Sequence, residues 1–124
     1  MTLFFALGSF LGGLAVILGA FGAHGLADRL TPDRLANFEI AVRYQIYHSL
    51  ALLAVALALA YFPAPAKYLQ IGGWLFFAGI LLFSGSLYVL SITGISWLGA
   101  VTPFGGVAFA LGWLMLLLAA WQAR

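Results

Sequence analysis

The chain contains few charged residues and no cysteine. Of its 124 residues, three are acidic and five are basic, and charged residues make up 6% of the chain, far below the about 25% of soluble domains. The lack of cysteine excludes disulfides, thiolate metal ligands and thiol catalysis. Hydrophobic residues make up 65%, and a soluble fold could not cover so much apolar surface. The composition therefore predicts an integral membrane protein.

The few charges are unevenly placed, and the gaps between them predict the number of spans. Six of the eight lie between Asp28 and Arg43, which leaves residues 1–27, 44–66 and 68–123 uncharged. A helix needs about 20 apolar residues to cross a hydrocarbon core of about 30 Å. The first two blocks are long enough for one span each, and the last for two. We therefore predict an all-α fold, a four-helix polytopic transmembrane bundle with up-down antiparallel helices in a single domain, 1–124.

Cap and turn signals place the helices. We expect spans at roughly 3–23, 44–62, 68–92 and 103–122, with the second helix extended back to about residue 32. Thr31-Pro32 is a helix start signal, which Thr102-Pro103 repeats. The extended second helix would be about 46 Å long, so its first third should project from the membrane or lie at the interface.

The first apolar run is predicted to be a retained helix and not a signal peptide. It has no basic segment before it, and it is longer than the apolar core of most signal peptides. It counts as the first of the four spans.

The up-down path brings polar residues from all four helices to one half of the bundle, on the side of the charged loop. An unpaired polar group in hydrocarbon costs several kcal/mol, and ionisable residues inside a membrane are functional candidates. These side chains either satisfy one another and fix helix register, or line a cavity open to one side. The candidate members of this polar half are His24, Glu39, Arg43, Tyr44, Gln45, His48, Ser49, Ser84, Tyr88, Ser91 and Thr102.

His48 is the most informative of these residues. It lies about 7.5 Å deeper along its helix than Arg43, and a neutral imidazole there needs both a donor and an acceptor partner. We expect His48 to lie inside the bundle and to bond to Tyr44, to His24 or to the stripe formed by Ser84, Tyr88 and Ser91. Two histidines without cysteine are too few for a closed zinc site. We therefore expect no metal and no cofactor.

Small residues at fourfold spacing predict close helix packing. Gly8, Gly12 and Gly19 mark the first helix, and Gly105 and Gly106 begin the fourth. The first stripe could face another helix of the bundle or a second copy, which would give a homo-oligomer. The Gly105-Gly106 pair could serve packing, or could let an anionic ligand approach a helix N-terminus.

Four short motifs resemble the signatures of one family. They are GAFGAHG at 19–25, YQ at 44–45 with HSLALL at 48–53, FSGSLY at 83–88, and TPFGG at 102–106 with GW at 112–113. Through them the chain is similar to domain-of-unknown-function family 423, which includes the eukaryotic transmembrane protein 256. The resemblance covers nearly the whole chain. It implies a small multi-span membrane protein and supplies no established activity.

The predicted function is that of a non-enzymatic membrane module whose polar half binds a small ligand, an ion or a lipid headgroup. The alternative is a structural, assembly or accessory subunit in which the polar half only fixes packing. We expect no catalytic residues, because no nucleophile–base–acid set has suitable spacing. The expected partners are the lipid bilayer and further copies of the chain in a homo-oligomer. No nucleic acid is expected.

The expected location is the cell (plasma or inner) membrane, crossed several times. The charged-loop side has Arg29, Arg34 and Arg43, and the opposite side has Lys67 and Arg124. The positive-inside rule compares these basic residues. Three against two is too close a count, so orientation stays open.

Overall fold

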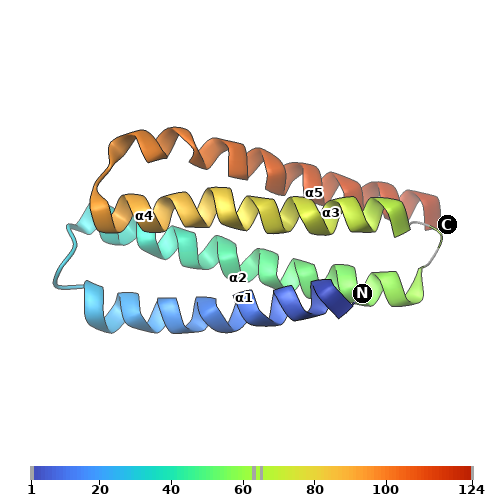
Figure 1. Cartoon of the computed structure of the whole chain (residues 1–124), viewed down its shortest axis with the longest axis horizontal. Coiled ribbons are helices and arrows are strands. Elements are labelled where there is room, and N and C mark those ends of the chain that lie inside the picture. The colour runs from blue at the N-terminus through green and yellow to red at the C-terminus, as the bar shows by residue number, and fades with distance from the viewer. Residues whose placement is uncertain (1, 63, 65, 124) are drawn as a thin grey trace.

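The fold is built from four long helical spans. The computed structural model describes residues 2–62, 64 and 66–123. Its elements, shown in Figure 1, are α1 (Thr2–Phe21), η1 (Gly22–Leu26), α2 (Pro32–Tyr61), α3 (Ala66–Gly79), η2 (Ile80–Ser84), α4 (Gly85–Thr93), η3 (Ser96–Ala100) and α5 (Thr102–Ala123). The π-helix η1 continues α1, and the π-helix η2 joins α3 to α4. Each of the four spans is long and apolar enough to cross a membrane. No strand occurs in these described residues, so the predicted all-α four-helix bundle is confirmed.

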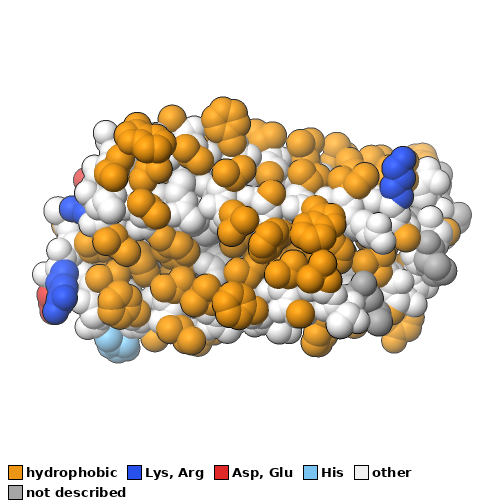
Figure 2. Space-filling view, in the orientation of Figure 1, with side chains coloured by type: hydrophobic (Ala, Val, Ile, Leu, Met, Phe, Trp, Pro, Cys, Tyr) orange, Lys and Arg blue, Asp and Glu red, His pale blue; other side chains and the backbone are white. Residues whose placement is uncertain are grey.

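The helices run up and down. α1 begins and α5 ends at the same end of the molecule, and the turns before α2 and after α4 lie at the other end (Figure 1). α1 packs on α2, α2 packs on α3 and α4, and α3 packs on α5. On the visible face, charged side chains gather near the two ends and hydrophobic ones lie between them (Figure 2). This distribution fits a bundle that crosses a bilayer.

α2 begins at the predicted cap. Thr31 has an extended backbone, its Oγ1 accepts a hydrogen bond from the Arg34 backbone N–H at 3.3 Å, and Pro32 takes the first helical position. The side chain thus satisfies one of the N–H groups that a helix start leaves free. At the other end the Phe62 N–H donates to the Ala58 carbonyl at 2.7 Å.

Two π-helical segments and one 3₁₀-helix differ from the continuous α-helices that the sequence predicted. The first span reaches Leu26, beyond the expected 23, through η1, and the third span, expected to be continuous, contains η2. Residues 96–100, between the third and fourth predicted spans, form the 3₁₀-helix η3. A π-turn holds one extra residue and rotates everything that follows it, so η2 sets the direction in which the α4 side chains point.

Glycines let neighbouring helices approach closely within the chain. A Cβ on Gly8 would lie 2.8 Å from the Ser49 carbonyl oxygen, and one on Gly19 would lie 3.3 Å from Val42 Cγ1. Gly12 is looser, with 3.7 Å to Ser49 Cβ. The stripe on α1 therefore faces α2 of the same chain. The stripe could have faced another helix of the bundle or a second copy, and in the structure it packs inside the bundle.

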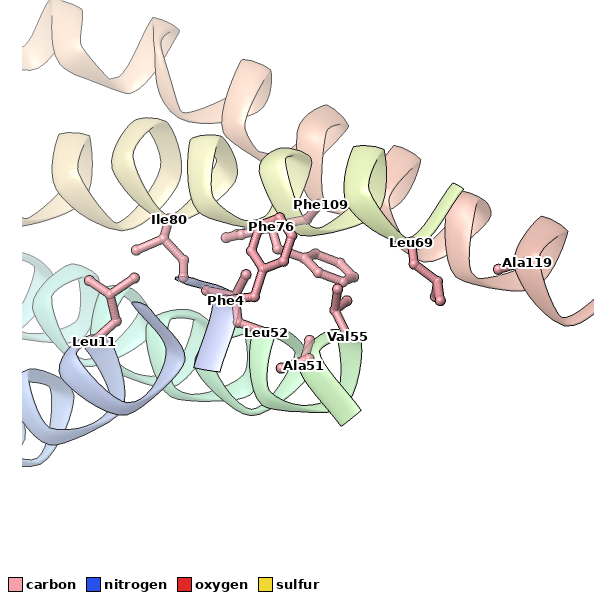
Figure 3. Packing of buried hydrophobic residues seen from close by; sticks show 11 residues of the cluster. Phe4, Leu11, Ala51, Leu52, Val55, Leu69, Phe76, Ile80, Phe109 and Ala119 are labelled. Carbon is pink, nitrogen blue, oxygen red and sulfur yellow. The ribbon is translucent and has the colours of Figure 1, made fainter. Parts of the chain in front are cut away.

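The hydrophobic core runs between all four spans. Phe4 of α1, Leu52 and Val55 of α2, and Phe76 of α3 meet with Phe109 of α5 (Figure 3). Burial of large side chains in lipid gives dispersion contacts and not a gain from leaving water. Packing against glycines makes these contacts numerous, since Gly73 faces Phe4 and Gly79 faces Phe109.

We predict that Gly105→Ala destabilises the bundle while Gly106→Ala does not. A Cβ on Gly105 would overlap the backbone of Phe83, with only 2.7 Å to its Cα, whereas one on Gly106 would lie 3.9 Å from Phe83 Cδ2. Overpacking of this kind costs about 1–3 kcal/mol. Reversible unfolding in mixed micelles measures both variants, and equal stability of the two would contradict the contact.

Candidate functional site

Gln45 is the centre of the polar groups that the structure brings together. It is 2% exposed. Its Nε2 donates to the Leu11 carbonyl of α1 at 2.8 Å, and its Oε1 accepts from the Tyr88 hydroxyl of α4 at 2.6 Å. One amide on α2 therefore links three helices, and both of its ends are bonded.

His48 lies one turn deeper and is also bonded at both ends. Its Nδ1 is 2.8 Å from the Tyr44 carbonyl oxygen, and Trp113 Nε1–H donates to its Nε2 at 3.1 Å. Because an indole N–H can only donate, Nε2 accepts and Nδ1 carries the proton, which makes the imidazole neutral. The ring stacks on Phe109 with centroids 3.6 Å apart. His48 is buried, as expected. Of the expected partners it bonds to Tyr44, through the backbone carbonyl, and among the described residues no bond joins it to His24 or to the stripe of Ser84, Tyr88 and Ser91.

The sequence reasoning missed Trp113 as a partner of His48. Trp113 belongs to the GW motif at 112–113, which was noted only for its resemblance. Its side chain is 49% exposed, so the indole covers the lipid-facing side of the histidine. The available signal was an indole donor on the fourth span, but an apolar helix does not reveal which of its faces is turned inward.

Serine hydroxyls complete the polar contacts. Ser84 Oγ donates across to the Ala41 carbonyl of α2 at 2.7 Å. Ser49 and Ser91 donate to carbonyls one turn back on their own helices, at 2.6 and 2.7 Å. Ser86, which was not predicted, shares a 2.6 Å hydrogen bond with Thr102 of α5. We call the following set the buried polar network: Gln45, His48, Ser49, Ser84, Ser86, Tyr88, Ser91, Thr102 and Trp113.

Four expected members lie wholly or partly outside this network. The His24, Glu39 and Arg43 side chains are exposed. Tyr44 contributes its carbonyl to His48, while its ring packs against Phe83 with centroids 4.6 Å apart. No ion pair joins Glu39 to Arg43 in the described part of the chain. His24 lies in η1 beyond α1, and Glu39 and Arg43 lie on the outward face of α2, so none of the three reaches the interior.

Arg34 is a further residue that the sequence reasoning missed. Its Nε donates to the Ser91 carbonyl at 2.7 Å, and its Nη2 donates to the Ile92 carbonyl at 2.6 Å. These carbonyls belong to the last turn of α4, which is followed by Gly94 in the left-handed conformation (φ 74°). A cation at a helix C-terminus bonds the free carbonyls and favours the helix dipole. The arginine thus joins the start of α2 to the end of α4.

The chemistry available at the network is hydrogen bonding. Among the described residues, every buried side-chain nitrogen or oxygen has a hydrogen-bond partner. No group of three His, Cys, Asp or Glu side chains that could hold a metal occurs in the same part of the chain. A groove of about 440 Å³ lies elsewhere, between the ends of α2 and α5, and its lining includes Phe62, Leu69 and Leu116. In this structure the network therefore joins neighbouring helices through hydrogen bonds.

The fold and this network define a multi-span, all-α membrane protein. The family described as "Protein of unknown function (DUF423)" matches residues 18–106. The chain belongs to this family, as the four motifs had indicated.

Relatives match over nearly the full length. The UPF0382 membrane protein YwdK of Bacillus subtilis is 50% identical over 120 residues, which covers 97% of each chain. The UPF0382 membrane protein SAB0533 of Staphylococcus aureus is 45% identical over 122 residues, or 98% of each. No solved structure matches the chain. The names of these relatives support a membrane protein and state no activity.

We predict that Tyr88→Phe lowers the free energy of unfolding by about 1 kcal/mol, because hydrogen bonds between membrane helices contribute about 0.6 kcal/mol on average and up to about 1.7. The loss leaves Gln45 Oε1 without its donor. In a double-mutant cycle, Tyr88→Phe should cost almost nothing once Gln45 is replaced by Met. Tyr61→Phe, at an exposed hydroxyl, is the control. Additive effects of the two substitutions would contradict the bond.

We predict that Arg34→Lys destabilises the protein by about 1–2 kcal/mol, because Lys keeps the charge but not the planar fork that reaches two carbonyls. The matched control is Arg29→Lys, at an exposed arginine of the loop that precedes α2. Unfolding measurements give the cost, and amide exchange at the end of α4 locates it. A stable Arg34→Lys variant with unchanged amide exchange would refute the capping of α4 by Arg34.

Proposed function

We propose that this protein is a non-enzymatic structural or accessory protein of the cell membrane, in which the buried polar network holds the helices in register. The complete pairing of Gln45 and His48 carries this proposal. Both ends of the amide and both ring nitrogens are engaged by the chain itself. A site that binds a polar ligand would keep such groups free for it. The pairing therefore supports the alternative of helix packing over ligand binding.

Arg34 supports the same proposal. Its guanidinium donates to two backbone carbonyls of α4. This basic side chain is therefore also bonded within the chain and not left free for a ligand. The cell membrane as the location is part of the proposal. It is supported by relatives in Bacillus subtilis and Staphylococcus aureus that are named membrane proteins.

A second candidate is a small-ligand site that opens when Trp113 moves. Half of the indole is exposed, and it contributes only one hydrogen bond to His48. If the side chain rotated away, Nε2 of His48 would face a gap beside Phe109. A ligand with one N–H or O–H donor would fit this acceptor. This candidate needs a conformational change, whereas the structural role needs none.

Native mass spectrometry in lipid nanodiscs distinguishes the two. We expect the purified protein to carry no small molecule that disappears in His48→Gln, and we expect Trp113→Phe to lower stability without changing the bound mass. Trp97→Phe, at an exposed tryptophan, is the matched control. A near-stoichiometric small molecule that is present in the unmodified protein and lost in His48→Gln would overturn the structural proposal.

A further inference from the structure

The outward face of α2 carries one acidic and one basic side chain, one helical turn apart, just before the residues expected to cross the membrane. Glu39 and Arg43 are exposed and form no ion pair in the described part of the chain. α2 has 30 residues, or about 45 Å, so a hydrocarbon core of about 30 Å centred on it leaves about 7 Å at each end. With the core centred on α2 in this way, and not confined to the expected span 44–62, Arg43 lies about 16 Å from the helix start and about 9 Å inside the core. Glu39 lies one turn nearer the surface.

The neighbouring helices present exposed apolar side chains at this level. Tyr44 packs against Phe83, and Phe83 lies against Gly105 of α5. On either side of Gly105, Phe104 is 70% exposed and Val107 is 57% exposed. On α1, Ile17 is 65% exposed near the contact between Gly19 and Val42. Bare apolar side chains surround the bundle at the depth where α2 presents two charges.

With the core centred on α2, both charges lie where lipid chains cannot satisfy them, so they need a partner. The four-residue spacing allows Glu39 and Arg43 to pair with each other, but this pair is not formed. Two surface hollows flank Arg43, one of about 280 Å³ beside Glu39 and one of about 360 Å³ beside Tyr44 and Tyr47. The α2 surface is therefore open on both sides of the arginine.

We propose that a second copy of this chain covers the outward face of α2, with Glu39 of each copy paired to Arg43 of the other. Two copies inserted the same way and related by a twofold axis along the membrane normal place their α2 helices at equal depth. The two residues are then about 6 Å apart in height, and an arginine side chain leans toward its helix N-terminus, which is the level of Glu39. One acid and one base a turn apart make the face self-complementary, as a twofold interface requires.

The charge pattern favours a second copy over a lipid. A lipid phosphate would satisfy Arg43 and leave Glu39 alone, whereas a copy satisfies both. Leu50, Ala54 and Leu57 continue the exposed face toward the other end of α2, and they supply the apolar contact for two helices side by side. The inference does not depend on the role of the buried polar network, which lies on the opposite side of α2.

Disulfide cross-linking in membranes tests the interface, because the chain has no cysteine of its own. Leu50→Cys lies on the outward face of α2, and Leu117→Cys, on the outward face of α5, is the matched control. Both side chains are exposed. We expect Leu50→Cys to form a cross-linked dimer and Leu117→Cys to form little. Equal cross-linking at the two positions would overturn the proposal.

Charge reversal then tests the pairing itself in the Leu50→Cys background. Glu39→Lys and Arg43→Glu should each reduce the dimer about tenfold or more, because like charges across an interface cost several kcal/mol. Coexpression of the two variants, with tags of different size, should restore a dimer containing one of each. Loss in the single variants without restoration in the mixture would overturn the proposal, and would point to a lipid headgroup or to a local defect at Arg43.

Discussion

Every polar group that enters the hydrocarbon must find its partner within the protein, and the arrangement of the helices follows from how Gln45 meets this requirement. Its amide donates to a carbonyl of α1 and accepts from a hydroxyl of α4. Because both bonds have fixed lengths, they set the distance of α1 and α4 from α2. His48 does the same for α5 through Trp113. Because an unpaired polar group in lipid is costly, only helix spacings that keep these hydrogen bonds are stable. Dispersion contacts between apolar side chains alone would not select one spacing.

Close backbone approach is what makes such bonds possible with short side chains. The hydroxyl of Ser84 reaches from one helix to the Ala41 carbonyl of the next. Nearby, Gly105 removes the side chain that would separate α5 from the backbone at Phe83. Gly8 has the same role between α1 and the carbonyl of Ser49. Small residues and hydroxyls therefore work as one system, since the first bring the helices together and the second hold their register.

The sequence predicted the spans well because the signals for them are local. The lengths of the uncharged blocks predicted four helices, and Thr31-Pro32 predicted the start of α2. The polar face that His48 shares with Tyr44, Gln45 and Ser49 predicted its burial. What depended on rotation about a helix axis was less accessible. Helical periodicity separates Glu39 and Arg43 from Gln45, but only the packing of neighbours decides which of the two faces turns inward.

The partners of the polar side chains were harder to predict because many of them are backbone carbonyls. Arg34 bonds to the carbonyls of Ser91 and Ile92, and a carbonyl has no signature in the sequence. The π-turn η2 follows from the fit between helices and not from a local signal, since Ile80–Ser84 is an ordinary apolar stretch. Trp113 stands on a helix that is apolar almost all round, so the sequence does not show which residues face the bundle.

The order of helix contacts has a consequence for biosynthesis. α1 with α2, and α3–α4 with α5, are two hairpins, each packed closely at glycines. When the first hairpin enters the membrane during translation, Gln45 already has its Leu11 acceptor, but Tyr88, Trp113 and the end of α4 have not yet been made. The Gln45 amide oxygen and Nε2 of His48 therefore have no partner in the bilayer until the second hairpin arrives. The unfinished protein is then a species that a membrane chaperone or protease could recognise by its unpaired polar groups, and that docking of the second hairpin conceals.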